Sequence, residues 1–274
     1  MNPKFSIVIP CLNEEKFIPH LLTSLTEQTI KNFEIVVVDG SSTDNTVAEV
    51  KKFEHKIVNL QIIISDKASL PLQRNLGASH TRGDWLIFAD ADTVLMPYFI
   101  ERIEWFINRR KPSFFTAWFR PDSEASGDAL ITLLANMMFE GSVIFHRPLS
   151  PGPLTIVTRK VYDLVGGYDE KHAFHEDMDF SLRAYKQGIS LNIFRETIYI
   201  LSLRRLRQQG VLTVLQQYIR ASLPVLFFNK TMTYMPGYVM GGQIYDKKKK
   251  PVKQTVLRRY ERKLKKLVKE FWVK

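Results

Sequence analysis

Cysteine is nearly missing from this sequence: Cys11 is the single one among 274 residues. The chain can therefore form no intrachain disulfide and no metal site built from several cysteines, which fits a reducing compartment. The apolar run FSIVIP near the N-terminus ends at a proline and is too short for the core of a signal peptide. No stretch of about 18 residues, the length that a spanning helix needs, is free of charged side chains, so we expect no transmembrane helix.

The positive charge is concentrated at the C-terminal end of the chain. Residues 246–274 hold 13 Lys or Arg and 3 Asp or Glu, a balance of +10, out of a total net charge of +11. The body of the chain is therefore close to neutral. An enzyme that acts on nucleic acid more often carries basic residues across its body, so we expect no nucleic-acid partner.

Strand-like and helix-like segments alternate along the first part of the chain. Short β-branched runs predict strands at 5–10, 34–39, 60–65 and 84–92, and apolar periodicity predicts helices at 16–28, 43–53 and 69–79. This alternation is typical of βαβ units and indicates an α/β fold with a mostly parallel sheet flanked by helices. Ligands in such folds bind at the carboxyl ends of strands, and Asn13, Asp39 and Asp90–Asp92 follow such ends.

The pattern weakens after Tyr98. We expect helices at 100–108, 129–139 and 180–187, strands at 113–119 and 154–159, and a turn at GGYDE. Apolar helical segments are expected over 206–228. The chain thus divides into a body (1–205), an apolar helical extension (206–245) and a basic tail (246–274).

The segment FADAD (residues 88–92) ends a predicted strand with two aspartates. Asp90 and Asp92 face the same side if the strand continues. Two like charges held close together are costly unless a cation neutralises them, and hard oxygen ligands suit Mg²⁺ or Mn²⁺ on a diphosphate. The alternative is an ordinary turn with solvated aspartates.

Two further acidic segments each have a functional and a structural interpretation. Asp39 in VVVDGSSTDNT (36–46) can accept hydrogen bonds from a nucleobase or ribose, or the segment is a helix-capping turn. In FHEDMDFSLR (174–183), one carboxylate beside others could act as a general base. Alternatively, these acids complement the dipole at a helix N-terminus.

The order of these segments resembles that of the family 2 glycosyltransferases, inverting enzymes with the GT-A fold. The resemblance covers roughly residues 4–205. It is carried by SIVIPCLNEE, EIVVVDGSSTDNT, LQRNLGAS, DWLIFADAD, LTIVTRKVYDLVGGYDE and HEDMDFSLRAYKQG. It implies that residues 1–205 form a GT-A catalytic domain.

The resemblance implies roles for individual residues. Asp39 corresponds to the aspartate that binds the base, and Asp90 and Asp92 to the pair that binds ribose or sugar and the metal, with Asp92 as the direct metal ligand. Asp177 corresponds to the catalytic base, with Glu176 beside it. Further residues correspond to the nucleotide pocket: Pro10, Leu12, Asn13, Glu14, Arg74 and Asn75.

Two departures from the family pattern stand out. Gly40 replaces the second aspartate that often follows the second strand. No histidine follows His175, although family members often have a metal-binding histidine there, so water or phosphate oxygens would complete the metal shell. The segment LSLRRLRQQG offers Arg204 and Arg205 as contacts to the diphosphate instead.

The implied reaction transfers a sugar from a nucleoside diphosphate sugar, UDP-linked by default and GDP-linked otherwise, to an acceptor hydroxyl with inversion at the anomeric carbon. The expected cofactor is Mg²⁺ or Mn²⁺. The expected acceptor is a saccharide or a lipid-linked molecule, as in the synthesis of cell-envelope polysaccharide. A catalytically degenerate glycosyltransferase-like scaffold, a nucleotidyltransferase and a nucleic-acid-binding protein are the alternatives.

The tail has helical periodicity over residues 254–274, with an apolar stripe on one side and Lys and Arg on the other. Such a segment is typical of an interfacial helix on anionic lipid. We therefore expect a cytoplasmic protein, peripheral on the inner face of the membrane. A solvated helix whose stripe packs on the domain, and a nucleic-acid tail, are the other interpretations.

Overall fold

The computed structural model of the chain describes residues 3–172 and 174–211, followed by isolated positions up to 233. The chain divides into two units, Met1–Gln243 and Ile244–Lys274, and every described residue belongs to the first. The predicted tail helix and most of the predicted apolar extension lie outside the described residues. The three-segment division therefore stays a prediction.

Within the described residues, strands form one sheet in the order β3-β2-β1-β4-β7-β6-β8-β5. Pairing is parallel for β1 with β2, β2 with β3, β1 with β4 and β6 with β8, and antiparallel for the other neighbours. The strands are β1 (Phe5–Cys11), β2 (Phe33–Asp39), β3 (Leu60–Ile64), β4 (Trp85–Ala89), β5 (Thr93–Leu95), β6 (Phe114–Pro121), β7 (Leu154–Thr158) and β8 (Asn192–Leu201).

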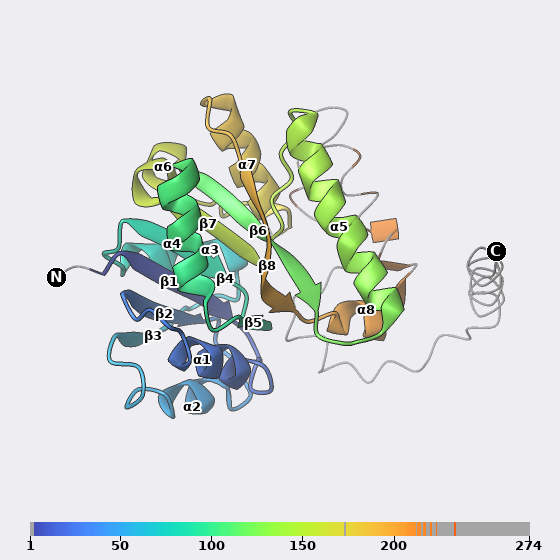
Figure 1. Cartoon of the computed structure of the whole chain (residues 1–274). Coiled ribbons are helices and arrows are strands. Elements are labelled where there is room, and N and C mark those ends of the chain that lie inside the picture. Colours follow the sequence, from blue (N-terminus) through green and yellow to red (C-terminus); the bar gives the residue numbers. More distant parts are fainter. Residues whose placement is uncertain are drawn as a thin grey trace, which may run out of the picture. The chain divides into compact units, whose positions relative to one another are not determined.

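Helices cover both faces of this sheet (Figure 1). They are α1 (Ile18–Thr26), α2 (Thr46–Lys51), α3 (Leu70–Ser79), α4 (Phe99–Arg110), α5 (Ser126–Ile144), α6 (Arg159–Val165), α7 (Glu176–Lys186) and α8 (Arg204–Gln209). Alternate β1 residues face opposite clusters: Ile7 lies in the cluster with α1 and α4, whereas Val8 lies in the cluster with α6 and α7. The α/β architecture expected from the sequence is confirmed.

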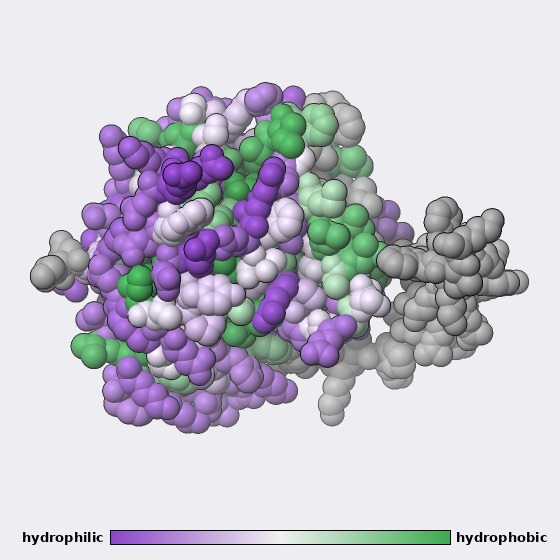
Figure 2. Space-filling model, in the orientation of Figure 1, coloured by the Kyte–Doolittle hydropathy of each residue, from purple (hydrophilic) through white to green (hydrophobic). Residues whose placement is uncertain are grey.

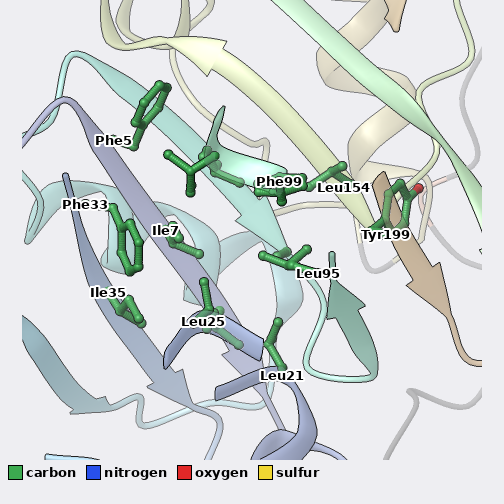
Figure 3. Packing of buried hydrophobic residues seen from close by; sticks show 14 of the residues in the cluster. Phe5, Ile7, Leu21, Leu25, Phe33, Ile35, Leu95, Phe99, Leu154 and Tyr199 are labelled. Atoms are coloured by element: carbon green, nitrogen blue, oxygen red, sulfur yellow. The ribbon is translucent and has the colours of Figure 1, made fainter. Parts of the chain in front are cut away.

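The larger apolar core lies between the sheet and the helices α1, α2 and α4. Phe5 and Ile7 of β1 point toward the same layer as Leu21 and Leu25 of α1 (Figure 3). All four side chains are almost completely buried. This packing fixes β1 in the middle of the sheet, and so fixes the loop that follows it.

The predicted elements of the first half are confirmed, with one difference that concerns the site. Strand β4 ends at Ala89, so Asp90 and Asp92 lie in the turn that follows and not on a continuing strand. The strand predicted through Asp92 is therefore too long, and the condition under which the two side chains would face one side is not met. The Asp90 N–H donates to the carbonyl of Pro153 (3.0 Å), which attaches the turn to the segment before β7.

The second half differs more from expectation. Strands β5 and β8 and helix α6 were not predicted, and α5 extends beyond the expected 129–139. Helix α7 begins at Glu176 and not at 180, directly after His175 in a left-handed conformation (φ 63°), and the acidic side chains of its first turn complement the helix dipole. Glu176 and Asp177 therefore lie in the first helical turn.

The sheet order sets the position of the site. Strand β1 continues to β2 and β3 on one side, whereas β4 pairs with β1 on the other, so strand order reverses at β1. The carboxyl ends of β1, β2 and β4 meet there, and crevices at such reversals are the usual binding place in α/β sheets.

Candidate functional site

The loops after β1 and β2 are joined by side-chain hydrogen bonds. The buried carboxylate of Asp39 accepts from the Ser42 N–H (2.8 Å) and from the Ser42 hydroxyl. Asn13, which has a positive φ of 54°, donates its N–H to Ser42 Oγ (2.8 Å) and accepts from the Thr43 N–H at Oδ1 (2.8 Å). Pro10, in β1, and Leu12 are buried beside this loop pair. The structure thus brings these predicted residues together.

The space at Gly40 is taken by Gln73 of α3. The Gln73 amide donates to the carbonyls of Cys11 (2.9 Å) and Val38 (2.8 Å), which joins β1 to β2 from the α3 side. A Cβ added at Gly40 would lie 3.0 Å from Gln73 Oε1. A larger residue at position 40 would therefore press on the Gln73 amide.

Glu14 and Asp92 share the guanidinium of Arg204. Arg204 Nη1 donates to Glu14 Oε2 (2.6 Å), and Nη2 contacts the other carboxylate oxygen. Arg204 Nε lies 3.0 Å from Asp92 Oδ2, and the guanidinium stacks over the Phe17 ring at 4.4 Å. The Arg204 side chain is mostly buried, so it supplies a fixed positive charge among these carboxylates.

Burial, with a smaller contribution from the nearby carboxylates of Asp90 and Glu14, raises the pKa of Asp92 to about 7 against the opposing effect of Arg204. Burial also raises the pKa of Glu14, again opposed by Arg204. The carboxylates of Glu14, Asp90 and Asp92 therefore carry more negative charge than the guanidinium of Arg204 can neutralise. A divalent cation bound at Asp90 and Asp92 would relieve that excess, so the residues present fit such an ion.

Arg74 of α3 connects the Asp90 turn to helix α7. Its side chain is 1% exposed; Nη1 donates to Glu176 Oε1 (2.9 Å), and Nη2 donates to Asp90 Oδ1 (3.1 Å) and to the Gly152 carbonyl (2.9 Å). A buried guanidinium is costly unless it is paired. Here the pairing holds two predicted acidic groups at fixed positions around one cation.

Asp177 follows Glu176 in the first turn of α7. Burial raises the pKa of Asp177 well above its usual range, and the charge of Glu176 raises it further while Arg74 lowers it. Its Oδ1 accepts from the Met178 N–H (2.8 Å), and a Cβ added at Gly152 would lie 3.0 Å from its Oδ2. A carboxyl group with a raised pKa suits proton transfer near neutral pH.

Asn75 has its amide bound to the GGYDE segment. Its Oδ1 accepts from the Tyr162 hydroxyl (2.7 Å) and the Tyr168 N–H (2.9 Å), and its Nδ2 donates to the Tyr168 carbonyl (2.8 Å) and Glu170 (3.1 Å). Asn75 therefore positions this turn beside α7. Any contact from Asn75 to a nucleotide stays a prediction.

A second acidic group lies outside the predicted metal pair. Asp169, His172 and Asp179 bring one ligand atom each within 4.8 Å of one another. Arg183 Nε already lies 2.6 Å from Asp179 Oδ2, so part of the negative charge is neutralised. The chemistry of this group favours a cation less than that of Asp90 and Asp92.

The fold and this site together define an α/β nucleotide-binding domain with acidic groups at the strand reversal. The family model described as glycosyl transferase family 2 matches residues 6–149, just over half of the chain. The chain belongs to this family of glycosyltransferases.

Relatives support the same assignment. An uncharacterised glycosyltransferase of Haemophilus influenzae is 26% identical over 66% of this chain and 62% of its own length. A PGL/p-HBAD biosynthesis glycosyltransferase of Mycobacterium bovis is 29% identical over 67% of this chain and 70% of its own. The chain thus spans somewhat under two thirds of the first relative's length.

Solved structures share the fold. Residues 1–349 of S. aureus TarS in complex with UDP-GlcNAc are similar, with a TM-score of 0.61, 25% identity, and coverage of 73% of this chain and 58% of that one. The mannosyltransferase PcManGT of Pyrobaculum calidifontis, in complex with GDP-Man and Mn²⁺, has a TM-score of 0.58 at 18% identity, and covers 82% of this chain and 68% of that one. The expected GT-A-type fold is confirmed.

Some residues of the site carry little signal in the sequence. Gly152 lies in a proline-rich loop, and its importance comes from its contact with Arg74 and its closeness to Asp177. The structure pairs Arg204 with Glu14 and Asp92, and its expected contact with the diphosphate stays a prediction. Nothing local to LSLRRLRQQG distinguishes Arg204 from its neighbouring arginines.

Proposed function

We propose that the chain transfers a sugar from a nucleoside diphosphate sugar to an acceptor hydroxyl, with inversion at the anomeric carbon. The observation that carries the proposal is the linkage through Arg74, which holds Asp90 on one side and Glu176, next to Asp177, on the other. This linkage supports a donor site and a candidate base at the same edge of the sheet.

In this proposal Asp177 accepts the proton of the acceptor hydroxyl as that oxygen bonds to the anomeric carbon. The bond from that carbon to the diphosphate oxygen breaks, and the nucleoside diphosphate leaves. Gly152 leaves room beside the Asp177 carboxylate, and burial together with the charge of Glu176 keeps the pKa of Asp177 high. Asp39, with the Asn13 loop, would hold the base and ribose.

Asp90 and Asp92 would hold Mg²⁺ or Mn²⁺, together with diphosphate and water oxygens. When bound, the ion supplies positive charge to the departing diphosphate. The PcManGT complex contains Mn²⁺, which supports a divalent ion in this fold. Arg204 would adjust its contact with Asp92 to share that carboxylate.

UDP is the nucleotide we propose, because the TarS complexes contain UDP and UDP-GlcNAc; the GDP-Man complex of PcManGT keeps GDP as the second choice. The acceptor would be a saccharide or a lipid-linked molecule of the cell envelope. A cytoplasmic protein held at the inner membrane face through residues 247–274 also belongs to this proposal.

Calorimetric titration tests the proposal directly. UDP and then GDP are titrated into the full chain, each with and without Mn²⁺, and Asp92→Ala is the matched variant. Metal-dependent binding of one nucleotide, lost in Asp92→Ala, is the expected result. Binding of neither nucleotide under any condition would instead favour a degenerate scaffold.

A further inference from the structure

Helix α5 is oriented with its apolar side outward. It is the one helix in the described part of the chain that is long and apolar enough to cross a bilayer, judged by length and composition alone. Yet only 17% of its most apolar 18-residue stretch is buried. The exposed large side chains recur at helical spacing and continue past the helix end: Leu130, Leu133, Leu134, Met137, Met138, Ile144 and Phe145. Green atoms gather over α5 in the space-filling view (Figure 2). We call these seven residues the α5 face.

The opposite side of α5 is polar and bound to the domain. Asn136 donates to the Phe119 carbonyl (2.9 Å) and accepts from the Phe119 N–H (3.3 Å) of β6. Ser142 Oγ accepts from the Leu149 N–H (3.0 Å) of the following loop. Hydrogen bonds and a few apolar contacts, such as those of Phe139, therefore hold the helix on the domain, while most of its large apolar side chains stay exposed.

Those hydrogen bonds exclude a spanning orientation for α5. Both of its ends connect to strands of the same sheet, β6 before it and β7 after it. At its N-terminal end Asp128 also lies 3.4 Å from Arg207 of α8. A helix held in this way can lie along a bilayer surface but cannot leave the sheet to cross it.

We propose that the α5 face docks on the interface of an anionic lipid bilayer. Monomeric soluble proteins seldom expose a contiguous apolar patch of this kind unless it meets a partner or a membrane. A protein partner would also need hydrogen-bonding groups, and the five exposed residues from 130 to 138 offer no polar side chain. Acyl chains require none.

The charges around the face fit the same occupant. Asp122 and Asp128 are paired with Arg207, and Glu140 is paired with Arg195 (2.5 Å), so the nearby acids do not face lipid unneutralised. The chain also carries a balance of +10 in residues 246–274. Apolar side chains and basic residues in one chain are the two contributions that hold a protein on anionic lipid.

The docked face would also connect to the acceptor side of the site. Helix α5 leads into the loop 145–153, whose Gly152 adjoins Asp177. Phe139 of α5 packs with Leu149, Met178 and Leu182, which joins the helix to α7. A lipid-linked acceptor could then reach Asp177 from the bilayer; only this step rests on the proposed function.

Vesicle sedimentation of the full chain tests the docking without any donor or acceptor, so its failure is distinguishable from failure of the transfer reaction. The probes are phosphatidylglycerol–phosphatidylcholine vesicles and pure phosphatidylcholine vesicles. The variant is Leu130→Gln/Leu134→Gln/Met137→Gln. The matched control is Val58→Gln/Ile64→Gln/Leu164→Gln, which changes three apolar residues elsewhere that are each more than half exposed.

We expect the α5 variant to lose tenfold or more of its partitioning onto anionic vesicles, with the control unchanged. Unaltered partitioning of the α5 variant would overturn the proposal. A change from dimer to monomer in sedimentation velocity, with vesicle binding retained, would also overturn it, since the face would then be an interface between copies.

A labelling experiment keeps the test valid if the triple variant folds poorly. A fluorophore sensitive to polarity is attached to Met137→Cys, with Val58→Cys as the control. Burial of Cys11 and the raised pKa of its thiol keep that residue from reacting. A blue shift on anionic vesicles at position 137 alone is expected. Equal spectra with and without vesicles would contradict docking through α5.

Discussion

Arg204 Nε lies 3.0 Å from Asp92 Oδ2 while the same guanidinium holds both carboxylate oxygens of Glu14. The positive charge that neutralises Asp92 in this structure is therefore a side chain. A divalent ion at Asp92 would have to share or displace it. In the proposed function, Arg204 would therefore compete with the metal ion for Asp92.

Replacing Arg204 with Met should strengthen Mn²⁺ binding to the free protein by about tenfold, since Asp92 and Glu14 lose their competing cation. Titration of Mn²⁺ without nucleotide measures this. Arg207→Met is the matched control, because Arg207 lies in the same helix but pairs with Asp122. Weaker Mn²⁺ binding in Arg204→Met would mean that Arg204 shapes the site and does not compete for it.

Asp177→Asn should lower kcat on the order of 10²-fold or more, the usual effect of losing a general base. The amide has nearly the same shape, so donor binding should change little. Initial rates with a saturating donor, together with the dissociation constant for UDP and Mn²⁺, separate the two effects. Loss of nucleotide binding in Asp177→Asn would place this residue in the donor site instead.

The pH dependence of kcat/KM should follow the raised pKa of Asp177. Below that pKa the carboxyl group holds a proton and cannot accept another, so the rate should still be rising with pH after ordinary carboxyl groups have ionised. Glu176→Gln removes a negative neighbour that raises this pKa. The rising limb should therefore move to lower pH in that variant, and an unchanged profile would exclude Asp177 as the titrating base.

Gly152→Ala should reduce kcat by roughly tenfold while nucleotide binding is retained, since small displacements of reacting groups have large effects on rate. The added Cβ would lie 3.0 Å from Asp177 Oδ2, so the carboxylate must shift. Gly141→Ala is the control, because a Cβ there meets nothing within 4 Å. Steady-state kinetics of both variants decide the matter, and equal kcat values would show that Asp177 tolerates the shift.

How far the sequence predicts the structure depends on where each residue's partners lie. The buried runs of β1, β2 and β4 are visible locally because central parallel strands are apolar on both faces. Strand β8 contains Arg195, Glu196 and Thr197 and pairs with β6 through an irregular register, so its sequence lacks that signal.

The residues of the site also divide into those that local motifs indicate and those that only long-range contacts bring together. Motifs of a few residues are enough to indicate Asp39, Asp90, Asp92 and Asp177. The pairing of Arg204 with Glu14 joins residues 190 positions apart, and no local pattern could indicate it. Helix α5 was predicted near its observed position, but its outward apolar side depends on hydrogen bonds from Asn136 to β6. Long-range contacts therefore determine the side-chain pairings and the helix orientation that local sequence patterns do not indicate.

Arg74→Met should lower the free energy of unfolding by about 3 kcal/mol, because it leaves the carboxyl group of Glu176 buried without its cation. The Arg74 and Glu176 side chains are 1% and 8% exposed, so water cannot replace the lost contact. Urea unfolding measures the change. Arg82→Met provides the comparison, since the Arg82 side chain is 70% exposed and lies 3.7 Å from Glu34; it should change stability by about 0.5 kcal/mol or less. Similar losses in the two variants would mean that Glu176 takes up a proton in Arg74→Met and that the Arg74 linkage positions the site more than it stabilises the fold.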